Sequence, residues 1–144
     1  MTAPEKISAG AFKKHVVEVM DRVKRALLFD LDKRLVLTTP VLTGRARAGW
    51  IGTSGDPAGT APDLRTEKDP IPKGQLPQGY AVPNVRPSTN PNMVYWETNN
   101  VEYISFLNDG SSEQAPKMFV EAAVLATSEF GQKIADAIDK QSPP

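Results

Sequence analysis

The sequence predicts an α+β fold, in which a long N-terminal helix and a C-terminal helix pack on a small antiparallel sheet. Three observations lead to this prediction. Apolar residues recur at helical spacing near both ends of the chain, and short β-branched and aromatic runs lie between them. A proline-rich stretch interrupts the middle. With 144 residues the chain has the length of one domain, which we assign to 1–144.

The first expected helix runs from Ser8 to about Thr38. This stretch contains no proline, Ser8 suits the N-cap position, and Pro40 prevents continuation. Apolar residues three or four apart line one face, namely Val16, Met20, Val23, Leu27, Leu31 and Leu35. A helix of this length spans about 45 Å at ~1.5 Å per residue. It therefore either crosses the whole molecule or projects one end towards a neighbour.

A single helical turn is expected next, capped by Thr43 and carrying Arg45 and Arg47. If this turn is helical, the two arginines diverge; if it is extended, they share one face and form a clamp for carboxylates. The first strand follows at 50–54. Gly49 and Gly52 either weaken this strand or mark positions where another segment packs close to the backbone.

Residues 55–92 are expected to form an extended Pro/Gly-rich loop or arm. They hold eight of the thirteen prolines and four of the ten glycines, and they show no helical period. Within the arm, residues 79–82 are expected to form a short strand that Pro83 ends or places at a sheet edge.

A second main strand is expected at 93–97, followed by a turn at 98–100. Residues 101–107 fit either a helical turn or an alternating strand, and we favour a short helix that ends at 108–110. The last helix is expected from about Pro116 to Lys140. Its expected inner face carries Phe119, Ala122, Ala126, Phe130, Ile134 and Ile138.

The formal net charge of zero hides a gradient along the chain. Residues 1–50 carry a net charge of +5, residues 51–92 are neutral, and residues 93–144 carry −5. Such a chain pairs its ends either internally or between copies, and both alternatives stay open. The zero total argues against a protein that coats nucleic acid by counterion release.

Catalytic chemistry is poorly supplied. The chain has no cysteine, and its one histidine, His15, is expected on an exposed helix surface. It has neither the Gly-x-Ser-x-Gly elbow of hydrolases nor the Lys-Ser/Thr pair of a phosphate-binding loop. Asp30 and Asp32 lie two apart on a helix and are expected to be solvated charges rather than metal ligands. We therefore expect no enzyme, no cofactor and no metal.

No apolar run approaches the roughly 20 residues of a membrane span, and the first residues lack an apolar signal region. Basic residues crowd the first third of the chain, but acids interleave with them and they form no single stripe. Phosphate binding through the basic N-terminal helix, as in a small DNA-associated accessory protein, stays the alternative function.

Three segments resemble signatures of the neck and tail-component proteins of long-tailed bacteriophages. Residues 39–50 (TPVLTGRARAGW) are similar to the family's Pro-x-x-Thr-Gly-x-Leu-Arg-x-Ser motif, which follows a long N-terminal helix. Residues 103–111 resemble an aromatic stretch that closes on Glu-x-Gly-Thr, and residues 114–123 resemble the Pro-x-Phe-Leu-x-Pro-Ala entry to the last helix.

The resemblance covers residues 8–54 and 100–140, and it includes clear departures. Ala46 stands where the family has leucine, Asn108 and Asp109 replace an acidic–aromatic pair, and Glu121 replaces the second proline. The arm at 55–92 has no counterpart in the family pattern.

The resemblance implies a virion structural protein that forms a homo-oligomeric ring, a hexamer or dodecamer, in the phage neck. Portal, adaptor or head-closure proteins would adjoin it on one side, and tail terminator or tube proteins on the other. DNA would only pass through the channel, and assembly would take place in the host cytoplasm. From exposed charge beside a polar loop, we expect interface contacts at Arg45, Arg47, Trp50, Tyr80, Arg86 and Asp109.

Overall fold

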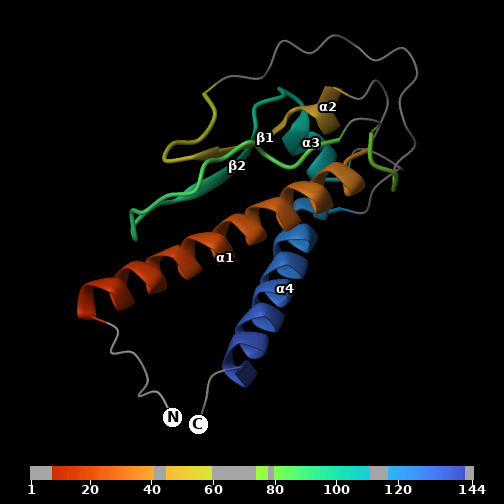
Figure 1. Cartoon of the computed structure of the whole chain (residues 1–144). Helices are drawn as coiled ribbons and strands as arrows, with labels where there is room; N and C mark the ends of the chain where they lie inside the picture. Colours follow the sequence, from red (N-terminus) through yellow and green to blue (C-terminus); the bar gives the residue numbers. More distant parts are fainter. Residues whose placement is uncertain (1–7, 41–44, 60–73, 78–79, 111–116, 142–144) are drawn as a thin grey trace.

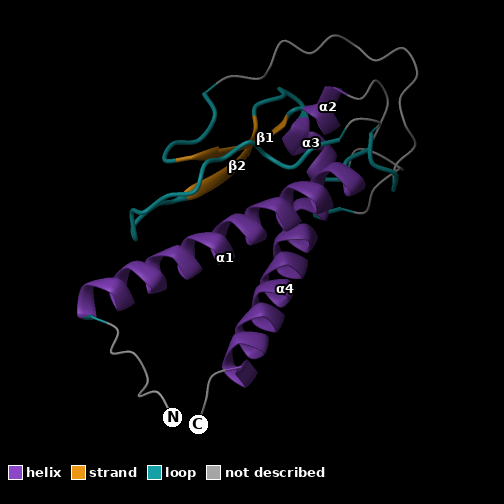
Figure 2. Cartoon of the chain, in the orientation of Figure 1, coloured by secondary structure: helices purple, strands orange, loops and turns teal. Residues whose placement is uncertain are grey.

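The structure is a computed structural model, and it describes residues 8–40, 45–59, 74–77, 80–110 and 117–141. The α+β architecture is confirmed. Helices α1 (Ala9–Thr38) and α4 (Phe119–Gln141) accompany an antiparallel sheet of β1 (Trp50–Ser54) and β2 (Tyr95–Asn99). Two short helices, α2 (Arg45–Ala48) and α3 (Ile104–Asn108), lie near the C-terminal end of α1 (Figure 1). The sheet and α4 lie along different sides of α1, and α4 diverges from α1 in a V (Figure 2).

The bounds of α1 agree with the prediction because local signals set both ends. The Ser8 side chain accepts a hydrogen bond from the Ala11 N–H at 3.1 Å, which makes Ser8 the N-cap. At the other end Thr39 is extended, and its hydroxyl donates to the Leu35 carbonyl at 2.6 Å. The same hydroxyl accepts from the Trp50 indole at 2.8 Å, so one buried threonine joins the end of α1 to β1.

The second strand is displaced from its predicted position. It begins at Tyr95 rather than Met93, and it continues to Asn99, so the turn predicted at 98–100 is wrong. The antiparallel register explains the shift, because Thr98 and Asn99 pair with the first two residues of β1. Tyr80 to Val82 form no strand, so the strand predicted at 79–82 is also wrong for its described residues; Gly79 lies outside them.

Both close approaches predicted at glycines are confirmed. A Cβ on Gly49 would lie 2.6 Å from Val101 Cγ2, and a Cβ on Gly52 would lie 2.5 Å from Pro83 Cβ. The ambiguous segment at 101–107 contains helix α3, as favoured. Gly110 follows its C-cap with a φ of 97°, a conformation that favours glycine.

Helix α4 begins at Phe119, and the predicted start at Pro116 lies outside the described residues. Asn108 caps the helix from a distance, because its side-chain oxygen accepts from the Val120 N–H at 2.9 Å. The buried residues of α4 are Phe119, Ala123 and Thr127. Ala122, which we expected on the inner face, is exposed, so the buried face is rotated relative to the predicted one.

The hydrophobic core is small and lies at one end of the molecule. Seven apolar side chains of the described ranges are buried, namely Leu28, Leu35, Val36, Ala46, Val101, Phe119 and Ala123. All of the α1 members lie in its C-terminal half. From Ser8 to Val16 every residue is exposed, so the N-terminal part of the helix gains little from this core.

Candidate functional site

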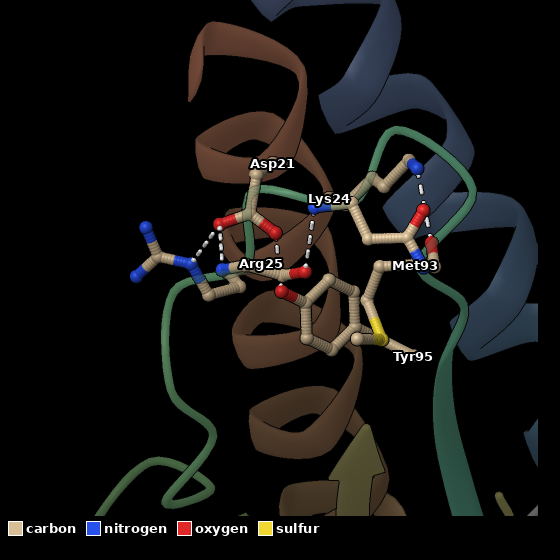
Figure 3. A network of polar contacts seen from close by, with 7 residues as sticks. Asp21, Lys24, Arg25, Met93 and Tyr95 are labelled. Carbon is tan, nitrogen blue, oxygen red and sulfur yellow. Dashed lines mark hydrogen bonds and ion pairs between the residues drawn. The ribbon is translucent and has the colours of Figure 1, made fainter. Parts of the chain in front are cut away.

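Polar side chains of α1 hold residues 80–94, here called the docked segment, against the helix. Asp21, which is 4% exposed, accepts hydrogen bonds from the Tyr95 hydroxyl, from the Ser88 N–H at 3.1 Å and from Arg25 Nε at 2.9 Å. Figure 3 shows Asp21 of α1 facing Tyr95 at the start of β2. One buried carboxylate thus joins the helix, the docked segment and the sheet.

Lys24 makes the second attachment. Its ammonium donates to the backbone carbonyls of Pro91 at 3.1 Å and of Met93 at 3.0 Å (Figure 3). Prolines deprive the docked segment of N–H donors, so it cannot pair as a regular strand. Side chains of α1 supply the hydrogen bonds that a sheet ladder would otherwise provide.

The pKa values of this network reflect burial opposed by hydrogen bonds. Burial alone would raise the pKa of Asp21, but the donors of Tyr95, Ser88 and Arg25 outweigh it and lower that pKa below its usual 3.8. Burial and the hydrogen bond to Asp21 raise the pKa of Tyr95 to about 12. At neutral pH the pair is therefore a charged acceptor and a neutral donor.

Two neighbouring acids, one from α1 and one from β2, lie further along the helix. Asp32, 4% exposed, accepts a hydrogen bond from the Tyr80 hydroxyl, and burial raises its pKa. Glu97 of β2 lies next to it. Burial and then the charge of Asp32 raise the pKa of Glu97 to about 9.

The surroundings of Glu97 support its neutral form. Both of its carboxyl oxygens are buried, and no donor among the described residues reaches them. An ionised Glu97 would therefore be a buried, unsatisfied charge, whereas the protonated acid can donate to the Asp32 carboxylate. The expectation that Asp32 is a solvated charge is wrong, because this residue faces the docked segment and β2.

A cavity of about 410 Å³ opens beside this acid pair. Its lining includes Asp32, Arg47, Trp50, Tyr80 and Pro83. Three of the six residues predicted at interfaces, Arg47, Trp50 and Tyr80, therefore meet around one cavity. The sequence gives no indication that these three residues meet, because they belong to α2, β1 and the docked segment.

Each of these three side chains bonds within its own chain. Arg47 is 3% exposed, and its Nη1 donates to the Gln75 carbonyl at 3.1 Å. The Trp50 indole donates to Thr39, and the Tyr80 hydroxyl donates to Asp32. Because α2 is helical, the alternative in which Arg45 and Arg47 share an extended face is wrong.

The other three predicted residues are exposed and do not line this cavity. Arg45 begins α2, Arg86 belongs to the docked segment, and Asp109 is the C-cap of α3. The sequence reasoning missed Asp21 and Glu97. The sequence does indicate that Asp21 and Asp32 are buried, because both lie on the helix face of the core leucines. Asp21 precedes Leu28 by seven residues, and Asp32 lies four residues after Leu28 and three before Leu35.

The arrangement places buried and half-buried hydrogen-bonding side chains of α1, α2 and β1 beside a cavity. Within the described ranges, no three His, Asp or Glu side chains gather as potential metal ligands. His15 is exposed on α1. None of the described helices has both the length and the apolar character needed to span a bilayer.

Six of the eleven large apolar side chains that are exposed in the described ranges lie on the two long helices. On α1 they are Phe12, Val16 and Met20, with exposed fractions of 61%, 37% and 45%. On α4 they include Val124, Leu125 and Ile138. Exposed apolar side chains that line one helix face typically mark an interface. In comparisons with known proteins, no family model, curated protein or solved structure matches this chain.

Proposed function

We propose that this chain is a structural subunit of the neck of a long-tailed phage. Copies of it would form an oligomeric ring that joins the portal or adaptor assembly to the tail and leaves a channel for DNA. The observation that supports this proposal best is the N-terminal half of α1, which extends away from α4 and exposes an apolar face (Figure 2). A helix that ends far outside its own core needs a neighbour to bury that face.

Two further features are compatible with a self-assembling structural role. The signature segment at 39–50 begins at the C-cap of α1 and includes α2 and the first residue of β1. The buried Thr39 and Arg47 stabilise this junction. The charge gradient between the chain's ends suits contacts in which the basic part of one copy meets the acidic part of another.

The alternative, phosphate binding by the basic helix, has less support. Several of its cations already bond within the chain: Arg25 to Asp21, Arg34 to Asp30 at 2.7 Å, and Lys24 to two carbonyls. A cation that is committed to a protein acceptor contributes less to counterion release on DNA.

Electron microscopy of the purified chain, combined with light scattering for mass, tests the proposal. A discrete ring with a central opening is the expected result. A gel-shift titration at two salt concentrations tests the alternative in parallel. A chain that stays monomeric and binds DNA tightly with a steep salt dependence would contradict the neck proposal.

A further inference from the structure

The exposed apolar face of α1 continues the face that receives α4. Leu27 and Asp30 of α1 meet α4 directly: Thr127 donates to Asp30 at 2.8 Å, and a Cβ on Gly131 would lie 3.1 Å from Leu27 Cδ2. Positions 12, 16 and 20 precede Leu27 on that face at helical spacing. Helix α4 diverges from α1 (Figure 2), and the side chains at these three positions are exposed. We call Phe12, Val16 and Met20 the apolar tip.

The opposite end of α1 has a matching concave feature. A cavity of about 400 Å³ lies where the last turns of α1 meet the first turns of α4. We call it the junction hollow, and its lining consists of Arg34, Leu37, Thr38, Phe119, Ala122, Ala123 and Ala126. The small alanine side chains leave the hollow unfilled on its α4 side. Leu125, next to Ala126 in the sequence, is 62% exposed. The hollow is thus an apolar recess beside an exposed apolar side chain.

A single copy cannot fill its own hollow with its own tip. Phe12 and Arg34 lie on one continuous helix, and their separation along its axis is about 33 Å at ~1.5 Å per residue. A second copy has no such restriction. The two features are different surfaces, so contact between them is head-to-tail and repeats until a ring closes or a filament grows.

Charge favours this pairing over contact between two tips. Lys13 and Lys14 adjoin Phe12, whereas Glu121, which also accepts from Asn108, and Glu129 are exposed on the first half of α4. Arg34, the cation in the lining of the hollow, is already paired with Asp30 at 2.7 Å. Two tips in contact would bring like charges together, but a tip on α4 brings opposite charges together. The weak link between Lys14 and Glu18, 4.0 Å apart and largely exposed, does not hold Lys14 in place.

We propose that the apolar tip of one copy docks in the junction hollow of a second copy, with Phe12 as the inserted side chain. The inference rests on the proposed function in so far as both require self-assembly, and it adds which two surfaces meet. An aromatic side chain inserted in an apolar recess is a typical anchor of a protein interface.

Disulfide trapping tests the contact sharply because the chain has no cysteine of its own. In the double variant Phe12→Cys/Ala122→Cys, a bond within one copy is impossible, since disulfides need Cα atoms within about 7 Å. Mild oxidation should therefore give a ladder of covalent multimers. The matched control is Phe12→Cys/Ser128→Cys, whose second cysteine lies on the opposite side of α4 from the hollow.

Monomers alone, dimers alone, or equal ladders from the test pair and the control would overturn the inference. A second variant protects the test against misfolding. Phe12→Ala removes a 61% exposed side chain, so it should leave the unfolding transition unchanged while weakening self-association about tenfold. Unchanged association in this variant would also contradict the proposal.

The outcome separates the contact from the neck function. A ladder from a chain that forms open filaments and no ring would keep the contact and remove the neck assignment. Rings that assemble normally from Phe12→Ala protein would keep the neck assignment and remove the contact.

Discussion

At the scale of single residues, the buried Asp21 and Asp32 and the half-buried Glu97 organise the centre of this molecule. Asp21 stays ionised because three donors surround it, including the Arg25 guanidinium. Glu97 is neutral because burial and the nearby Asp32 leave its charge unsupported. A carboxyl group on α1 and a carboxyl group on β2 therefore differ in protonation state, according to the donors around each.

The state of Glu97 predicts a stability that falls as pH rises. Its pKa is raised from 4.5 to about 9 in the folded chain, so its contribution is complete below about pH 4.5 and is lost as pH rises towards 9. Glu97→Gln keeps a neutral side chain at every pH. Urea unfolding at pH 5, 7 and 9 should show a flatter decline in the free energy of unfolding for this variant. Parallel declines in both proteins would show that Glu97 ionises freely in the fold.

Gly52 carries a second residue-scale prediction. A Cβ at this position would lie 2.5 and 2.6 Å from two ring carbons of Pro83, and a proline ring cannot rotate away. Gly52→Ala should therefore lower the free energy of unfolding by about 2 kcal/mol, in the range of overpacked sites. Gly59→Ala is the matched control, because nothing lies within 4 Å of a Cβ there. Chemical denaturation that finds equal stabilities for the two variants would contradict the close approach of Pro83.

At the scale of elements, α1 does more than supply an apolar face. It binds the docked segment through charged side chains, and this segment has no strand pairing of its own at Tyr80 to Val82. A proline-rich segment loses little chain entropy when it is fixed, so a few hydrogen bonds suffice to hold it. The docked segment then covers β1 through Pro83.

Lys24 tests this attachment. Lys24→Met keeps the length of the side chain but removes the donors to the Pro91 and Met93 carbonyls. The expected loss is about 1–3 kcal/mol in the free energy of unfolding, the usual range for hydrogen bonds from a charged group. Amide hydrogen exchange should quicken near residues 88–95 first. Lys33→Met is the control, because Lys33 is exposed on the same helix. Equal exchange in the two variants would show that Lys24 does not anchor the segment.

At the scale of the whole molecule, the V of α1 and α4 places a small core at one end and an apolar tip at the other (Figure 2). Two of the arginines in the basic part of the chain are paired within one copy. Arg25 and Arg34 pair with acids of their own helix, not with the acidic C-terminal part. Exposed acids of α4, such as Glu129 and Asp136, thus stay available to another copy.

A charge-reversal experiment addresses this scale. Lys13→Glu/Lys14→Glu should weaken self-association about fivefold, since each exposed pair contributes roughly 0.2–1 kcal/mol. Mixing this variant with Glu129→Lys protein should restore association between the two, and added salt should reduce the difference. Sedimentation velocity of the separate and mixed variants measures it. Restoration by wild-type protein to the same degree as by Glu129→Lys would argue against the charge match.

Signals that act over a few residues made much of the fold predictable. Ser8 begins a helix through its side chain, and Pro40 and Gly110 end helices through their backbone conformation; none of these effects needs a distant partner. Gly49 before β1 and Gly52 within it indicated close approaches, and both occur. The second strand was misplaced by two residues because its bounds depend on the register with β1, which is a contact over more than 40 residues.

The residues of the candidate site could hardly be predicted, because contacts between distant parts of the chain bring them together. Arg47, Trp50 and Tyr80 are predicted from the sequence as exposed interface residues, but the fold places them around one open cavity. Asp32 was assigned to solvent, and only the packing of Tyr80 and Glu97 shows that it is buried. The sequence by itself determined the α+β class, the extent of α1 and the zero net charge with its gradient. The tertiary structure alone decided which charges are buried and which helix faces stay open, because burial depends on partners far apart in the chain.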